Sequence, residues 1–126
     1  MQGRYLFVEA NAEFVTFGVE NWGVVSSSTT PLWNSATTHC MGHLRLAGGK
    51  PIGKGTCRWT AVGGDTAVGE WECPPAGPPT WTWLSGTGKL KGIAGGGSFQ
   101  DVVSAKPGTP GIGAGCRRDW GKAYLP

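Results

Sequence analysis

A chain of 126 residues is the length of one domain and can bury a single core without help from metals or subunits. Its 23 glycines and 9 prolines exclude a mainly helical protein, because each interior glycine costs a helix about 1 kcal/mol relative to alanine. The 7 tryptophans argue against disorder. The net charge of +3 comes from scattered basic residues, which gives no basic stripe for a nucleic-acid partner.

Short segments of β-branched and aromatic residues predict strands in the first half of the chain. The first two are expected over residues 4–10 and 13–20. Residues 21–33 hold a run of serine, threonine and proline, which predicts a loop. A long strand is then expected over residues 35–46, followed by a glycine-rich turn.

The clearest local signal is a hairpin with arms over residues 54–62 and 66–73. Each arm carries one cysteine and one tryptophan two positions apart, so each pair shares a strand face. These pairs are Cys57 with Trp59 and Trp71 with Cys73. The opposite faces are polar and carry Thr56, Arg58, Thr60, Glu70 and Glu72.

The second half of the chain continues the pattern after a stiff, proline-rich connector over residues 74–79. A helical turn is expected over residues 89–93, with Leu90 and Ile93 packing inward. Residues 106–115 predict a flexible, lid-like loop. Strands are expected over residues 80–84, 98–104 and 116–125.

Seven to eight strands joined mostly by short turns either close into a barrel or stack as a sandwich. Closure removes exposed strand edges, which a monomeric β protein must otherwise protect. We therefore predict an all-β fold, a single antiparallel β-barrel of about eight strands over residues 1–126 with at most one short helical turn.

Three stretches together resemble a known group of proteins: GTCRWT…GGDTAVGEWEC, WTWLSGTGKLKGIAGGGSF, and a terminal cysteine-bearing strand ending in YLP. The chain resembles small exported bacterial β-barrel proteins that are described as lipocalin-like, and it is similar in outline to the allene oxide cyclase and dirigent barrels. The resemblance covers residues 35–125 and is closest over residues 85–99. It implies an eight-stranded barrel with a central cavity. It transfers no catalytic residue, because the shared pattern describes a turn.

The four cysteines have no C-x₂-C spacing, which argues against a zinc ribbon or a thioredoxin-type motif. Two disulfides in an exported protein are expected, with four free thiols in a cytosolic barrel as the alternative. The expected pairs are Cys40 with Cys57 and Cys73 with Cys116. The N-terminus lacks the apolar run of a signal peptide, so a periplasmic or secreted location would require a signal that this sequence does not include. No segment approaches the roughly 20 apolar residues of a membrane helix.

Charged and polar side chains gather on one face of three adjacent predicted strands. If this face points into the barrel, the residues form a buried cluster able to carry out acid/base chemistry. If it points to water, they are ordinary cross-strand pairs, and burial of the opposite cysteine and tryptophan face favours this second arrangement. The candidate catalytic residues are Arg58, Glu70, Glu72, His39 and His43.

A metal site on this face is not expected. His39 and His43 lie on one strand, about 13 Å apart at roughly 3.3 Å per residue, whereas two ligands of one metal must each be about 2 Å from it.

Three functions stay open. The first is binding of a small apolar or aromatic molecule in the barrel cavity, with Trp59, Trp71, Trp81 and Trp83 as the lining and residues 106–115 as a mouth loop. The second is a cofactor-independent cyclase or isomerase, in which Arg58 would stabilise developing negative charge. The third is a structural or interaction protein. No cofactor and no metal are expected, and homo-oligomer formation stays open.

Overall fold

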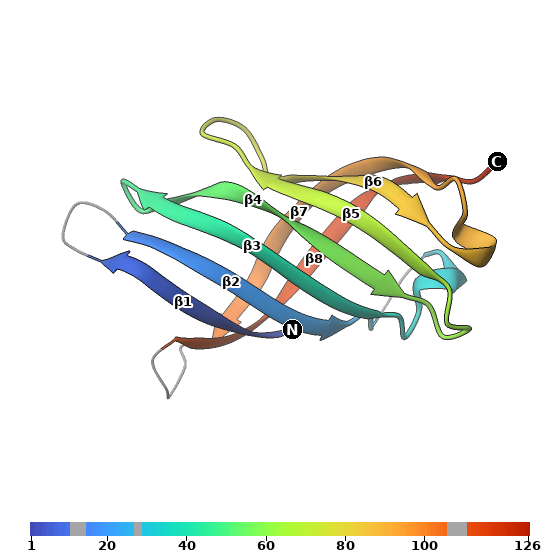
Figure 1. The fold of residues 1–126 in the computed structure, drawn as a ribbon, viewed down its shortest axis with the longest axis horizontal. Helices are drawn as coiled ribbons and strands as arrows, with labels where there is room; N and C mark the ends of the chain where they lie inside the picture. The colour runs from blue at the N-terminus through green and yellow to red at the C-terminus, as the bar shows by residue number, and fades with distance from the viewer. Residues whose placement is uncertain (11–14, 27–28, 106–110) are drawn as a thin grey trace.

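The computed structural model describes residues 1–10, 15–26, 29–105 and 111–126. These residues form eight strands and two single 3₁₀ turns (Figure 1). The strands are β1 (Gln2–Ala10), β2 (Val15–Val24), β3 (Thr37–Ala47), β4 (Lys50–Thr60), β5 (Thr66–Cys73), β6 (Thr80–Gly86), β7 (Ala94–Ala105) and β8 (Ile112–Tyr124), and the turns are η1 (Pro31–Trp33) and η2 (Gly88–Leu90).

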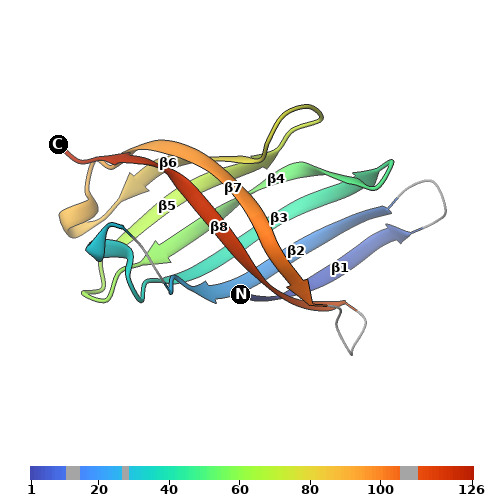
Figure 2. The ribbon, with the colours of Figure 1, turned by 180° about the vertical axis from the view of Figure 1, so that it is seen from behind.

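The strands close into a barrel in which each strand pairs antiparallel with the next and β8 returns to β1. Seen from behind, β7 and β8 run diagonally across the other strands (Figure 2). The prediction of an all-β, eight-stranded antiparallel barrel is therefore confirmed. Because side chains alternate between the two faces of every strand, one set of alternate residues from each strand lines a common interior.

The β4–β5 hairpin is present, with its second arm over 66–73 as predicted and its first arm over 50–60 where 54–62 was predicted. Its register fixes which face lies inside. Cys57 and Trp71 are 2% and 7% exposed, whereas Arg58, Glu70 and Glu72 are exposed. The cysteine and tryptophan face therefore forms the interior and the charged face meets water. Burial of large apolar side chains is the main favourable term in folding, which explains the orientation.

Glycines in β3 and β4 make room for a tryptophan ring inside the barrel. A Cβ atom placed on Gly42 or on Gly55 would collide with the indole of Trp71. Gly69 lies in the same way against the rings of Trp59 and Trp83. The glycine content of these strands therefore serves side-chain packing as well as turns.

The buried side chains form two clusters along the barrel. The first contains Cys40, Cys57, Trp71, Cys73 and Phe99. The second contains Ala67, Trp83, Leu90 and Ile93, with Leu32, Trp33, Trp59 and Trp81 packed against it. Leu90 and Ile93 are 0% and 4% exposed, so the turn around η2 buries both residues as predicted.

Three predicted loop boundaries were wrong. Residues 21–24 belong to β2, where Asn21 and Trp22 pair with Cys40 and His39 of β3. The glycines at 95–97 belong to β7, and residues 112–115 belong to β8. In each case pairing with a neighbouring strand outweighs the weak strand preference of glycine and asparagine. The predicted strand residues 13–14 and the lid-like residues 106–110 lie outside the described residues.

The seams of the barrel differ in length. β1 pairs with β8 only over Gln2–Arg4 and Ile112–Ala114, and β6 pairs with β7 over three residues. Beyond its short pairing with β1, the part of β8 from Cys116 to Tyr124 pairs with β7 along one edge. No described strand pairs with its other edge.

Within the described ranges, no helix is long and apolar enough to cross a membrane.

Candidate functional site

One end of the barrel interior holds a cavity of about 330 Å³. Its walls come from β1, β2, β3, β4, β5, β7 and β8 and are mainly apolar and aromatic. The large apolar side chains of this surface include Tyr5, Val19, Leu44, Trp71 and Phe99. Tryptophan and phenylalanine rings with branched aliphatic neighbours form a surface suited to a flat apolar molecule.

The cavity exists because several wall positions carry no side chain. Gly3 of β1 and Gly113 and Gly115 of β8 line it. A Cβ atom on Gly113 would contact the ring of Tyr5, and one on Gly3 would contact the side chain of Asn21. The sequence therefore leaves space at this end of the barrel, while tryptophans and aliphatic residues fill the other end.

Two residues of the cavity lining each carry a buried polar atom that has no hydrogen-bond partner among the described residues. These atoms are the carbonyl oxygen Oδ1 of Asn21 and Nε1 of Trp71. Their residues are 8% and 7% exposed. Buried polar groups in folded proteins are nearly always hydrogen-bonded. The Nε1–H groups of Trp81 and Trp83 are unpartnered in the same way, so these groups do not mark the cavity.

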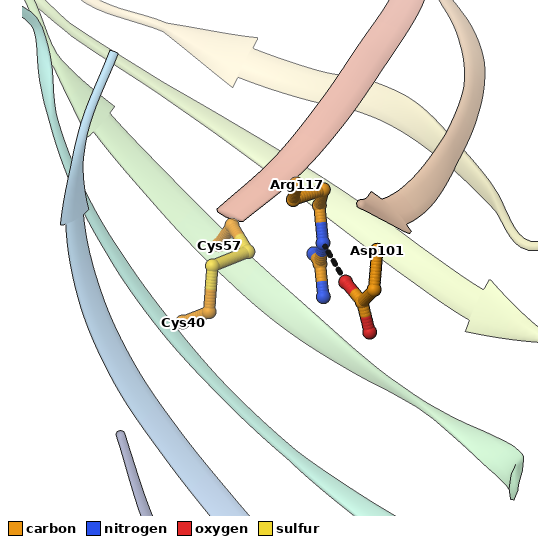
Figure 3. Close-up of a disulfide and its surroundings, with 4 residues drawn as sticks. All are labelled: Cys40, Cys57, Asp101 and Arg117. Carbon is orange, nitrogen blue, oxygen red and sulfur yellow. Dashed lines mark hydrogen bonds and ion pairs between the residues drawn. A yellow bond between two sulfur atoms is a disulfide. The ribbon is translucent and has the colours of Figure 1, made fainter. Parts of the chain in front are cut away.

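An ion pair also lines the cavity. The Nε–H of Arg117 on β8 donates to Oδ1 of Asp101 on β7 at 3.2 Å (Figure 3). The guanidinium group lies 4.1 Å from the ring centroid of Phe99, within cation–π range. Figure 3 draws this pair together with the Cys40–Cys57 disulfide. The pair places a cation and an anion together, which leaves this wall without net charge.

The buried thiol of Cys73 is a further wall group. Burial raises the pKa of this thiol above its ordinary value of 9.0, and the nearby Arg117 guanidinium opposes the rise only in part. Cys73 is therefore a neutral thiol at physiological pH and a weak nucleophile.

Of the four predicted ligand-binding tryptophans, Trp71 lines the cavity. Trp83 belongs to the other cluster, where it stacks on Trp33 with ring centroids 5.2 Å apart, and Trp59 and Trp81 pack against both clusters. Trp59 and Trp81 meet Trp83 edge-on at 4.8 and 5.1 Å. Their packing partners are other rings, so these three tryptophans act as core residues in the structure.

The cavity residues that the sequence did not single out lie on strands outside the β4–β5 hairpin. Asn21 fell in a predicted loop, which removed it from consideration. Phe99 and Asp101 are two positions apart on a predicted strand, so alternation could have placed them on one face. Arg117 could not have been assigned to the cavity, because its position depends on how β8 closes the barrel.

The candidate catalytic residues lie on the outer surface. Arg58 and His39 are cross-strand neighbours there. The nearest carboxylate partner of His39 is Glu20, with Nε2 and Oε1 3.0 Å apart, and His43 contacts the hydroxyl of Thr16. Glu70 and Glu72 are exposed on β5. The buried cluster that the enzymatic hypothesis requires is therefore absent from these five residues.

Glu20 is the centre of a surface network instead. Arg4 donates to its Oε2 from Nε at 2.8 Å, and the ring of His39 stacks on Trp22 with centroids 5.3 Å apart. Hydrogen bonds from His39 and Arg4 lower the pKa of Glu20 below its ordinary value of 4.5. In the described part of the chain, no three His, Cys, Asp or Glu residues are grouped to hold a metal ion.

The predicted disulfide between Cys40 and Cys57 is confirmed, because these residues are direct cross-strand partners on the interior face. The predicted pair of Cys73 with Cys116 was wrong, and both are free thiols. Cys73 is buried and faces the cavity, whereas Cys116 is exposed on β8 next to the cavity-facing Arg117. Alternation along β8 therefore directs Cys116 outward and away from Cys73.

No family model, no curated protein and no solved structure matches this chain. The resemblance to lipocalin-like, allene oxide cyclase and dirigent barrels therefore stays a prediction from the residues.

Proposed function

We propose that this protein is a small barrel that binds a small apolar or aromatic molecule inside its cavity. One observation carries the proposal: the barrel keeps a mainly apolar cavity of about 330 Å³ that is lined by aromatic and aliphatic side chains and by the Arg117–Asp101 ion pair. Ligand sites in proteins are concave and mostly apolar, start at about 300 Å³, and carry a few polar groups that orient the ligand.

The two ends of the barrel support the proposal by their contrast. At one end, Trp83 packs with Leu90 and Trp33, and Trp59 and Trp81 pack between this cluster and the one beside the cavity. At the other end, three glycines line the wall. A protein with a purely structural role would gain stability by filling both ends, because native interiors pack without large voids.

Binding is favoured over catalysis because the proposed proton-transfer groups are solvated. Arg58, Glu70 and Glu72 lie on the outer face, where water screens their charges. Inside the cavity, the thiol of Cys73 is neutral and Arg117 is already paired with Asp101.

The disulfide supports an exported protein. Disulfides persist in oxidising compartments and are rare in the cytosol. We therefore place the protein in the periplasm or outside the cell, where the Cys40–Cys57 bond would remain oxidised.

The test is isothermal titration calorimetry with a panel of aromatic and lipid-like compounds. Substitution Leu44→Trp places a large side chain in the cavity and should weaken binding at least tenfold. Substitution Leu84→Trp is the matched control, because Leu84 is 56% exposed, and it should leave affinity unchanged. Circular dichroism confirms that both variants fold. If no compound binds, or if the filled variant binds as well as the wild type, the proposal is wrong.

A further inference from the structure

The C-terminal part of β8 has one strand edge that no described strand covers. From Cys116 to Tyr124, β8 pairs with β7 along one edge, and its short pairing with β1 has already ended (Figure 2). Every residue from Arg118 to Tyr124 is exposed, so side chains on both faces of this stretch reach solvent. An open edge presents a regular row of N–H and C=O groups, which is a template for pairing with another strand.

On the outer face of this stretch, cations alternate with aromatic rings. Arg117 lines the cavity, so the residues at even positions point outward. They are Arg118, Trp120, Lys122 and Tyr124. The two aromatic residues are 49% and 59% exposed. Among the described residues, none of these four side chains has a hydrogen-bond, ion-pair or ring partner.

This alternation makes the edge complementary to a second copy of itself. Two identical strands that pair antiparallel are related by a twofold axis, and the residue on the axis sets the register. With Gly121 on the axis, Lys122 of each copy lies opposite Trp120 of the other, and Arg118 lies opposite Tyr124. Directly opposite side chains are about 4.5–5.5 Å apart at Cβ, which is close enough for cation–π attraction.

The neighbouring registers bring like charges together. An axis at residue 118 or 122 would place Arg118 or Lys122 opposite its own copy. An axis at Asp119 would oppose two aspartates, and an axis at Trp120 would oppose Arg118 and Lys122. Like charges directly opposite each other are destabilising. The charges therefore disfavour these registers and permit the one centred on Gly121.

We propose that this protein forms a twofold-symmetric dimer in which the β8 strands of two copies pair antiparallel around Gly121. On the inner face of the joined strands, Asp119 of each copy lies opposite Ala123 of the other, so no like charges meet there. One pair of strands buries less area than the roughly 1,200–2,000 Å² of a stable interface, so the dimer should be weak and should form as the concentration rises. The dimer does not depend on the proposed ligand binding.

Two measurements on the wild-type protein test the dimer. Sedimentation velocity over a concentration series detects it, and hydrogen–deuterium exchange locates it. Amides from Cys116 to Tyr124 should exchange more slowly as the protein concentration rises, whereas those of β4, which is paired on both sides, should not change. A protein that stays monomeric at millimolar concentration, or a dimer without this change in β8, overturns the proposal.

Substitution Lys122→Glu tests the side-chain complementarity. It removes a cation–aromatic pair twice in each dimer, so the dimer dissociation constant should rise about five- to thirtyfold. Arg45→Glu is the matched control, because Arg45 is exposed on β3, which is paired along both edges, and it should leave the dissociation constant unchanged. Equal effects would assign the association to net charge and contradict the proposal. A tighter dimer of the Lys122 variant would place its new carboxylate opposite Arg118, which also contradicts the register around Gly121.

Cysteine cross-linking tests the register directly, at a concentration where the wild type is dimeric. In a Cys116→Ser background, Arg118→Cys combined with Tyr124→Cys should form disulfides between copies, because these positions lie opposite each other. Within one strand they are roughly 20 Å apart, too far to bond in one chain. Each single variant should remain uncross-linked on non-reducing electrophoresis. If the combined variant gives no more cross-linked dimer than the single ones, the register is wrong.

Discussion

Gly55 shows how one absent side chain supports the interior of this barrel. Its position lies against the carbonyl of Met41 and the indole of Trp71. Sequence reasoning placed Gly55 on a strand but gave it no role, because the collision depends on a side chain from the neighbouring strand. The same limit applies to Asn21 and Arg117, whose importance arises from partners distant in the chain.

Gly55→Ala should destabilise the protein by about 1–3 kcal/mol, because the added methyl group forces the Trp71 ring or the β3 backbone to shift. Gly63→Ala is the control. Gly63 lies in the β4–β5 turn, where an added Cβ would meet no atom within 4 Å, so the change should stay within about 0.5 kcal/mol. Urea unfolding followed by tryptophan fluorescence measures both, and equal effects would contradict this account of Gly55.

The two free thiols provide a second test at the scale of single residues. Cys73 is buried and its pKa is raised, whereas Cys116 is exposed. The thiolate is the reactive form, so a maleimide reagent should label Cys116 first and Cys73 slowly, with the Cys73 rate rising as the pH increases toward and above 9. Peptide mapping by mass spectrometry reads both sites. If neither thiol is labelled, the two residues are bonded to each other in solution.

At the scale of elements, the alternation of residues predicted the hairpin well. Cys57, Trp59, Trp71 and Cys73 share a face because side chains alternate along a strand, and their apolar character places that face inside. The same reasoning anticipated the Cys40–Cys57 disulfide. It failed for Cys116. In a segment of mixed polarity such as GCRRDWGKAY, the sequence does not show which of the two alternating sets of side chains faces the interior.

The disulfide should contribute measurably to stability by joining β3 to β4. It closes a loop with a sequence separation of 17, for which the loss of chain entropy in the unfolded state gives about 3 kcal/mol. The double substitution Cys40→Ala, Cys57→Ala should therefore lower the unfolding free energy by about that amount. Cys116→Ser, at an exposed free thiol, should have little effect. An unchanged denaturation midpoint in the double variant would mean that the bond does not form in solution.

At the scale of the whole molecule, strand number and the choice of a barrel followed from glycine content, tryptophan content and turn spacing. The location of the cavity could not be predicted from these features of the sequence. It depends on interior positions of seven strands, and Gly3, Gly113 and Gly115 meet only when β8 returns to β1. Tryptophan spacing drew attention to the hairpin and its neighbouring strand, whereas Trp59, Trp81 and Trp83 are core residues that do not line the cavity.

The one-sided pairing of β8 has a consequence for how the barrel opens. Amide hydrogens from Cys116 to Tyr124 lie on a strand that a neighbour holds along one edge only, so local opening there should require less free energy than in β4, which is paired on both sides. Hydrogen–deuterium exchange of the dilute, monomeric protein should therefore be faster over Cys116–Tyr124 of β8 than in β4, and a bound ligand that contacts the Arg117 wall should slow it. Uniform exchange along all strands would contradict this. On this basis, we expect a guest molecule to enter sideways, as β8 separates from β1, without passing through an end of the barrel.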